Sequence, residues 1–387
     1  WYTKLDFKTR GECMIYFDYA AATPVDKDVL NEYVMLTKHY GNPNSVHSLG
    51  LESLNLVNKY TENMATLLGV DTEELIYTSG ASESNNLAIK GCALRYKNFG
   101  KHILISSLEH NSVTASALSL QQMGFEVELI PINKNGLIDC EMLRKMIRND
   151  TILVSVCAVD SEMGLVQPIK EIAEIVKNYP HCIFHTDATQ AIGKVTFNFS
   201  IPDLVTLAPH KFYGLGSSGL LIKKKSVSLV PQIDGGRSTS VYRSGTPDLP
   251  MIGAMCVALN KALTNIDKNC DYVTNLSNKI KTELREYENV ILNSRDNSIS
   301  YTINFSLKGM KSLDIQKMLN EYDIIVGTKT SCCPVLTPSK LVYALTKDKQ
   351  IASSSIRLSI SYLTTEKEVN TFLEVFDKIY KEYYGEV

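Results

Sequence analysis

The chain has 387 residues, of which 44% are hydrophobic, enough for a large core in two or three structural units. Its 40 lysines and arginines nearly balance 42 aspartates and glutamates, so no basic field favours a nucleic acid partner. No apolar run approaches the length of a membrane span, and we expect no membrane association. Nine scattered cysteines without a CxxC pair or metal-ligand spacing predict a cytoplasmic protein without a metal site.

The order of predicted elements indicates an α/β fold. Short apolar strands (75–77, 102–105, 151–156, 181–185 and 220–225) alternate with helical runs such as 169–177, which predicts a mostly parallel sheet. Later come helices at 251–265, 272–287 and 366–383 and a strand at 301–305. We therefore predict a large domain over residues 29–250 and a smaller α+β domain over 251–387, packed with the N-terminal segment 14–28. Residues 1–13 are polar, lack the apolar core of a signal peptide and are expected to be an extension.

Three short motifs carry the chemistry: Glu109-His110, the run from His185 to Gln190, and Pro209-His210-Lys211. Pyridoxal phosphate needs a lysine to hold it as a Schiff base, a carboxylate to keep its ring nitrogen protonated, and a flat partner for its ring. Lys211, Asp187 and His110 supply these groups in turn. The motifs therefore predict a pyridoxal phosphate site in which Asp187 controls the electronics of the ring.

Taken one at a time, these residues have simpler interpretations. Lys211 after a histidine is usually part of a solvated pair, and His110 could simply cap or pack against a helix. The turn 79–82 between a strand and a helix is, by itself, an ordinary helix cap. Asp187 differs because it lies at the carboxyl end of a buried strand, where ligands bind in open α/β sheets. A carboxylate buried there is costly without a cationic partner.

Taken together, the motifs resemble the NifS/IscS-like cysteine desulfurases. These are pyridoxal phosphate enzymes of the aminotransferase class V type, with the aspartate aminotransferase-like transferase fold. The resemblance runs from residue 16 to near the C-terminus and rests on five further segments in family order: YFDYAAATP (16–24), YGNPNS (40–45), TSGASESNN (78–86), RSGT (243–246) and SSIRLS (354–359).

The resemblance also implies roles for individual residues. His110 would stack on the pyridine ring and move protons, and Gln190 would contact the phenolic oxygen of the ring. Arg357 would clamp the substrate carboxylate, because a guanidinium offers two parallel donors to a planar anion. Thr246 would reach a phosphate in the neighbouring subunit, which implies a homodimer with shared active sites. Further expected site residues are Ala81, Ser82 and His210 for the cofactor and Asn42 for the substrate.

The family places a nucleophilic cysteine on a loop before the arginine, and Cys332 matches that position, with Cys333 as the adjacent alternative. L-cysteine would be converted to L-alanine while its sulfur passes to the thiolate as a persulfide. The persulfide would then go to an acceptor or scaffold protein for iron–sulfur cluster assembly, tRNA thiolation or another pathway. A selenocysteine lyase or another β-lyase on the same scaffold is the nearest alternative.

Three departures from the family pattern bear on activity. Ser161 stands where most relatives have an amide, so its contact to the ring oxygen would be a shorter hydroxyl contact. Ala208 replaces a serine and removes one phosphate hydrogen bond. The stretch 235–240 lacks the usual pattern, and Arg237 could replace lost contacts. These changes leave open a catalytically impaired scaffold that binds a sulfur-acceptor protein.

The run from Gly214 to Gly219 matches GxGxxG, with Asp234 about twenty residues further on, as in dinucleotide-binding sites. That fingerprint must lead from a strand into a helix. Here Gly219 leads into the apolar run 220–225, which predicts a strand. A loop after the cofactor lysine explains the glycines better than a nicotinamide site.

Overall fold

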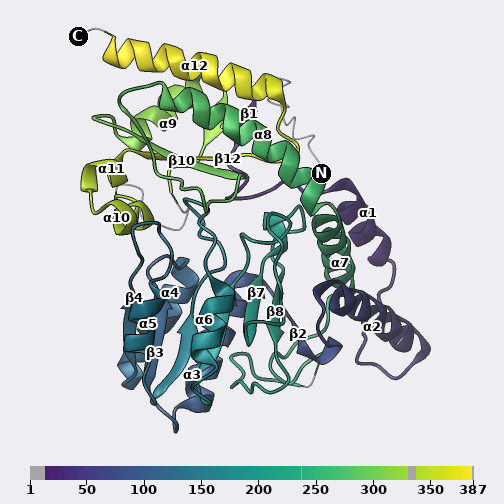
Figure 1. Ribbon diagram of the computed structural model, residues 1–387. Coiled ribbons are helices and arrows are strands. Elements are labelled where there is room, and N and C mark those ends of the chain that lie inside the picture. The colour runs from purple at the N-terminus through teal and green to yellow at the C-terminus, as the bar shows by residue number, and fades with distance from the viewer. Residues whose placement is uncertain (1–13, 237, 330–336, 386–387) are drawn as a thin grey trace.

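The computed structural model describes residues 14–236, 238–329 and 337–385. Its largest layer is a seven-stranded sheet in the order β2-β8-β7-β6-β5-β3-β4 (Figure 1). Only β8 runs antiparallel to its two neighbours in this sheet. The strands are β2 (Leu75–Thr78), β3 (His102–Ser106), β4 (Glu126–Ile130), β5 (Thr151–Ser155), β6 (Ile183–Asp187), β7 (Leu204–Leu207) and β8 (Gly219–Lys223).

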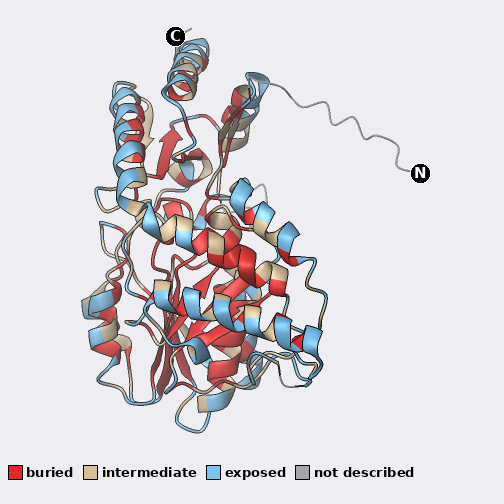
Figure 2. Cartoon of the chain, turned by 90° about the vertical axis from the view of Figure 1, so that its right-hand side faces the viewer, coloured by how far each residue is buried: buried red, intermediate tan, exposed pale blue. Residues whose placement is uncertain are grey.

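Helices cover both faces of this sheet, as its apolar strands require. Alternate residues of β3 serve the two faces: Ile103 and Ile105 pack in one hydrophobic cluster and Leu104 in the other. The fully buried strands lie at the centre of this unit, with exposed helix surfaces outside (Figure 2). The helices are α1 (Lys27–Leu36), α2 (Ser48–Leu68), α3 (Ala81–Tyr96), α4 (Asn111–Ser119), α5 (Cys140–Met146), α6 (Ile169–Val176) and α7 (Leu249–Thr264), with 3-10 turns η1 (Thr72–Glu74), η2 (Leu120–Met123) and η3 (Pro209–Lys211).

A second unit lies beyond the carboxyl end of the large sheet (Figure 1). Its antiparallel sheet has the order β12-β10-β9, and β1 pairs in parallel with β11. The pairing of β1 brings the start of the described chain beside the C-terminal unit. The elements are β1 (Ile15–Phe17), β9 (Val290–Leu292), β10 (Thr302–Leu307), β11 (Ile324–Val326), β12 (Ser355–Ser359), α8 (Ile266–Arg285), α9 (Ser312–Glu321), α10 (Lys340–Thr346), α11 (Lys349–Ser353) and α12 (Glu366–Tyr384).

The predicted α/β order is confirmed, and so is the strand after the glycine-rich run, because β8 begins at Gly219. Two helices begin earlier than predicted. Helix α7 begins at Leu249 because the Asp248 carboxylate caps it by accepting a hydrogen bond from the N–H of Met251. Helix α8 begins at Ile266 instead of residue 272. The domain boundaries themselves remain a prediction.

Among the described residues, no individual helix has both the length and the apolar character needed to cross a membrane, although the bent pair α7 and α8 together reaches those limits. No group of three or more metal-ligating side chains lies together in the described part of the chain.

Candidate active site

A cavity of about 440 Å³ lies at the carboxyl ends of β5, β6 and β7, where α3 begins. Most residues predicted for the site line this cavity: Lys211, Asp187, Gln190, His110, Ala81, Ser82, His210, Ser161 and Arg357. Asn42 and Thr246 are exposed and do not line it within this chain. Cys332, Cys333 and Arg237 lie outside the described residues.

Lys211 reaches the cavity from η3, the short turn that follows β7. Its Nζ donates hydrogen bonds to the carbonyl oxygens of Ala20, at 2.8 Å, and Ala21, at 2.6 Å. These carbonyls belong to the N-terminal segment that follows β1. The segment therefore positions the amine that would hold a carbonyl cofactor.

Asp187 is the last residue of β6, and its side chain lies in the cavity wall. Its Oδ2 accepts a hydrogen bond from Asn85 Nδ2 at 2.9 Å, and its Oδ1 accepts one from the N–H of Thr189 at 3.0 Å. Both donors are neutral groups. The carboxylate is thus fixed in place while it keeps the capacity to accept a further, charged donor.

His110 is the N-cap of α4, and its Nδ1 accepts a hydrogen bond from the N–H of Ser112 at 3.2 Å. Burial lowers the pKa of His110; Asp187 opposes this shift and Lys211 adds to it. Burial also lowers the pKa of His210 to about 4, helped by Lys211 and His110. Both imidazoles are therefore neutral near pH 7.

Glu109 precedes His110 and is buried beside the cavity. Its Oε1 accepts hydrogen bonds from Ser106 Oγ and from the N–H of Cys157, both at 2.7 Å. Burial raises the pKa of Glu109 to about 8, and the nearby Asp187 contributes to the shift. Glu109 is therefore mostly protonated at neutral pH.

The N-terminus of α3 forms one end of the cavity, where Ala81 and Ser82 present the first turn of the helix. Free N–H groups and the helix dipole make such an end a binding site for a phosphate. The neighbouring Gly219 is required for close packing, because a Cβ there would lie 2.5 Å from the carbonyl carbon of Gly80.

Arg357 projects from β12, and its side chain is 2% exposed. Its Nη2 donates to Asp18 Oδ1 at 2.7 Å and its Nη1 to the carbonyl oxygen of Ser161 at 2.8 Å. Its Nε is buried and has no hydrogen-bond partner among the described residues. The guanidinium is thus held in the cavity wall with donor capacity left for an anion.

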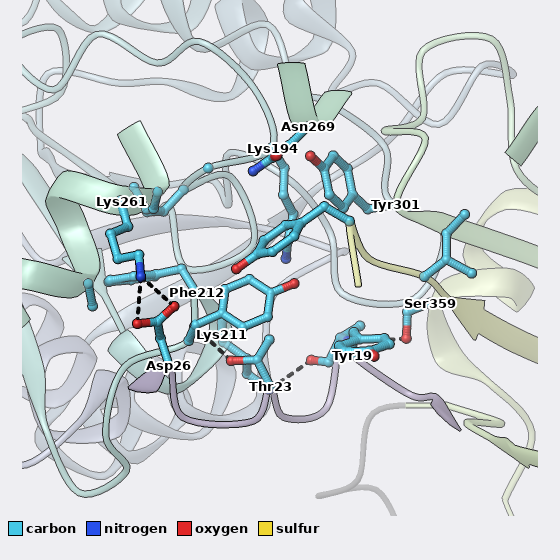
Figure 3. Close-up of a pocket in the computed structure, with 18 of the residues that line it drawn as sticks. Tyr19, Thr23, Asp26, Lys194, Lys211, Phe212, Lys261, Asn269, Tyr301 and Ser359 are labelled. Carbon is cyan, nitrogen blue, oxygen red and sulfur yellow. Dashed lines mark hydrogen bonds and ion pairs between the residues drawn. The ribbon is translucent and has the colours of Figure 1, made fainter. Parts of the chain in front are cut away.

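A second, smaller cavity of about 40 Å³ also has Lys211 in its lining (Figure 3). Ala20 and Lys211 line both cavities. Lys194 and Lys261 line the smaller one. Lys194 Nζ donates to Gln190 Oε1 at 2.8 Å, and Gln190 Nε2 donates to the Ala20 carbonyl at 3.0 Å. Burial lowers the pKa of Lys194 to about 7. Because Lys194 occupies the amide oxygen, the orientation of Gln190 is fixed.

The residues present fit pyridoxal phosphate. The volume of the larger cavity is in the range typical of small-molecule sites, about 300–1,000 Å³. A lysine, a buried carboxylate, a neutral imidazole and a helix N-terminus meet in it, and they match the aldehyde, ring nitrogen, ring face and phosphate of the cofactor. This fold and site define the class: an α/β protein with the pyridoxal phosphate-dependent transferase fold.

Comparison with known proteins gives the family. The model of the aminotransferase class V family matches residues 15–372, and the chain belongs to this family. A NifS/IscS homologue from Lactobacillus delbrueckii subsp. bulgaricus is 37% identical, with 96% of this chain and 98% of that protein covered. The cysteine desulfurase IscS of Dictyoglomus turgidum is 34% identical, with 94% of each chain covered.

Solved structures agree with these relatives. A NifS-like protein has a TM-score of 0.89 and 31% identity, covering 95% of this chain and 99% of its own. The protein SspA, solved in complex with cysteine, has a TM-score of 0.80 and 30% identity, covering 91% of this chain and 100% of its own. The chain is therefore a NifS/IscS-type member of the family.

Sequence reasoning gave no role to several residues that the fold brings to the site. Asp18 and Asn85 lie inside the recognised motifs, yet only the folded chain pairs them with Arg357 and Asp187. Ser112 and Lys194 lie outside those motifs. A signal for Ser112 was present, since a serine two residues after an N-cap can contact the capping side chain.

Proposed function

We propose that this chain is a pyridoxal phosphate-dependent cysteine desulfurase that converts L-cysteine to L-alanine. The observation that carries the proposal is that Lys211, Asp187, His110 and Arg357 line one cavity. Its support from relatives is the desulfurase IscS, which is 34% identical over nearly the whole chain.

Each residue has a role that follows from its position. Bound pyridoxal phosphate would supply an electron sink that makes the α-proton of an amino acid acidic. Lys211 would hold the cofactor and, once displaced by substrate, accept the α-proton. Asp187 would keep the ring nitrogen protonated, and Gln190 would donate to the phenolic oxygen. Ala81, Ser82 and His210 would bind the phosphate.

The buried Arg357 guanidinium would bind the carboxylate of an amino acid substrate with two hydrogen bonds, and we propose L-cysteine as that substrate. The related SspA has been solved in complex with cysteine, which supports this choice. Ser161 lies beside Arg357, whose Nη1 contacts its backbone carbonyl. A hydroxyl contact from Ser161 to the cofactor is part of the proposal.

Cys332 is the proposed nucleophile. Its thiolate would attack the substrate sulfur, so that a sulfur–sulfur bond forms, the Cβ–S bond of cysteine breaks and alanine leaves. Cys157 also lines the cavity, but burial raises the pKa of its thiol well above the ordinary value, which disfavours the reactive thiolate. The persulfide would pass to an acceptor protein in the cytoplasm.

A homodimer is part of the same proposal. The α1–α2 region exposes seven large apolar side chains, and grouped exposed apolar residues often mark an interface. These are Leu30, Val34, Met35, Tyr40, Val46, Leu49 and Leu51. Thr246 and Asn42 are also exposed, which would let them serve the site of a second subunit.

The test is the yield of alanine and persulfide from L-cysteine, with the purified protein loaded with pyridoxal phosphate. Cys332→Ala should abolish both products, whereas Cys333→Ala should keep them. Loss in Cys333→Ala alone would move the nucleophile by one residue. Cofactor binding without any alanine from L-cysteine would refute the desulfurase proposal. If the same protein then released selenide from selenocysteine, it would be identified as a selenocysteine lyase.

A further inference from the structure

A chain of side-chain hydrogen bonds connects Asp187 to His110 through two residues on different helices. Asn85, on α3, is fully buried, and its Nδ2 lies 2.9 Å from Asp187 Oδ2 and 2.8 Å from Ser112 Oγ. Ser112, on α4, places the same Oγ 2.8 Å from His110 Nδ1. The chain joins β6, α3 and the first turn of α4.

The direction of each hydrogen bond follows from the donors available. The Asn85 amide has two N–H groups, one for Asp187 and one for Ser112. The opposite orientation of the amide would place its oxygen against a carboxylate. His110 Nδ1 accepts from the N–H of Ser112 and so carries no proton; the hydroxyl of Ser112, which accepts from Asn85, therefore donates its own proton to Nδ1. Nδ1 thus accepts twice, and the neutral ring carries its proton on Nε2.

We propose that Asn85 and Ser112 are positioning residues that hold His110 as the neutral Nε2–H tautomer and couple its protonation to Asp187. Protonation of Nδ1 would remove the acceptor for the N–H of Ser112 and uncap α4. It would also place a cation at a helix N-terminus, where the dipole disfavours positive charge. The N-cap and the helix dipole therefore both oppose protonation of His110, and the Ser112 hydroxyl adds to this opposition by donating to Nδ1.

Charged and titratable groups around His110 act on the same equilibrium. Asp187 on β6 favours the imidazolium, whereas Lys211 on η3 disfavours it and burial lowers the pKa further. His210, also on η3, and the adjacent Glu109 are uncharged at neutral pH, because burial shifts the pKa of each. Without the hydroxyl of Ser112, the attraction of Asp187 for a protonated His110 would meet less opposition.

The inference rests on the proposed function in one respect, the placement of His110 against the cofactor ring. A protonated imidazole stacked on a protonated pyridine would bring two cations face to face. A neutral Nε2–H ring avoids that repulsion and leaves Asp187 to interact with the ring nitrogen alone. Ser112 and Asn85 would thereby preserve the electronic role of Asp187.

The experiment is a nitrogen-15 NMR titration of the histidine-labelled full chain, with and without pyridoxal phosphate. Among the seven histidines, the signals of His110 are assigned by their absence in His110→Gln. Wild type should show an unprotonated Nδ1. Ser112→Ala should mix the tautomers and raise the pKa of His110 by about 0.5–1 unit, the equivalent of one hydrogen bond. Ser112→Thr, which keeps the hydroxyl, should restore the wild-type values.

Ser116→Ala is the matched control, because within the described part of the chain the Ser116 hydroxyl bonds only the backbone oxygen of Ser112, at 2.6 Å, on the same helix. It should leave the His110 signals unchanged. A protonated Nδ1 in wild type overturns the inference, and so does an equal shift in Ser116→Ala or no shift in Ser112→Ala. The cofactor-free titration decides this separately from the proposed function, whose failure would instead appear as no binding of pyridoxal phosphate.

Discussion

The ion pair between Asp18 and Arg357 should be a major determinant of stability when no substrate is present. Arg357 Nη2 and Asp18 Oδ1 are 2.7 Å apart, and the side chains are 2% and 20% exposed respectively. Asp18→Ala would leave a buried guanidinium without its counter-charge. Because 339 residues separate the partners, the change would also loosen the contact between the N-terminal segment and β12.

The magnitude follows from the burial. Removing one partner of a buried ion pair costs about 3–5 kcal/mol of unfolding free energy. Asp18 is partly exposed, and the Ser161 carbonyl still accepts from Arg357, so we expect the lower end, about 3 kcal/mol. The exposed pair of Lys381 and Asp377, one helical turn apart on α12, should contribute only about 0.3–0.5 kcal/mol.

Urea unfolding at pH 7 of the cofactor-free full chain would compare Asp18→Ala with the control Asp377→Ala. A second arm adds L-alanine, whose carboxylate can replace Asp18 beside Arg357 and should stabilise Asp18→Ala more than wild type. The reasoning is refuted if Asp18→Ala loses no more free energy of unfolding than Asp377→Ala.

Three further changes test other parts of the site. Burial raises the pKa of Glu109 from 4.5 to about 8. Between these pH values the folded chain keeps the Glu109 proton, whereas the unfolded chain has released it. The free energy of unfolding therefore falls as the pH rises, by at most about 1.4 kcal/mol per pH unit. Urea midpoints from pH 5 to 8 should show Glu109→Gln gaining on wild type, and a constant difference would contradict this. Lys194→Met removes the hydrogen bond that fixes the Gln190 amide. It should weaken pyridoxal phosphate binding about fivefold in an absorbance titration, the equivalent of one hydrogen bond of about 1 kcal/mol. The control Lys261→Met should bind normally, and equal affinities of wild type and both variants would disprove the role of Lys194. In Gly327→Ala the new Cβ would lie 2.7 Å from Asp18 Oδ1, which should lower the free energy of unfolding in urea by about 1–3 kcal/mol. Gly216→Ala places its Cβ in open space and should lower it less. Equal losses in the two variants would argue against close packing at Gly327.

The elements and the cavity wall could be predicted because they depend on local patterns. Continuous apolar runs predict strands buried on both faces, as β3 and β6 are. Asp187 ends one strand of the sheet, and Lys211 and His110 each follow another; parallel strands bring their carboxyl ends to one edge. Their meeting was therefore implied by the order of the elements.

Contacts between distant segments could not be predicted in the same way. The partner of Arg357 comes from the N-terminal segment, which the pairing of β1 with β11 and the bridge between Asp18 and Ser359 place beside β12. The Asn85 amide meets Ser112 because α3 and α4 pack on the same face of the sheet, and a helical pattern predicts which residues are buried but not what they contact. Asn42 remains a predicted substrate residue, and Thr246 remains a predicted phosphate contact in a second subunit.

The most direct test of the central claim is the attachment site of pyridoxal phosphate. The purified protein would be incubated with pyridoxal phosphate, reduced with borohydride and digested, and the modified peptide would be sequenced by mass spectrometry. We predict one stoichiometric pyridoxyl group on Lys211 and none in Lys211→Ala. Labelling of Lys194 or of surface lysines in wild type, with Lys211 unmodified, would contradict the assignment of this cavity as the active site.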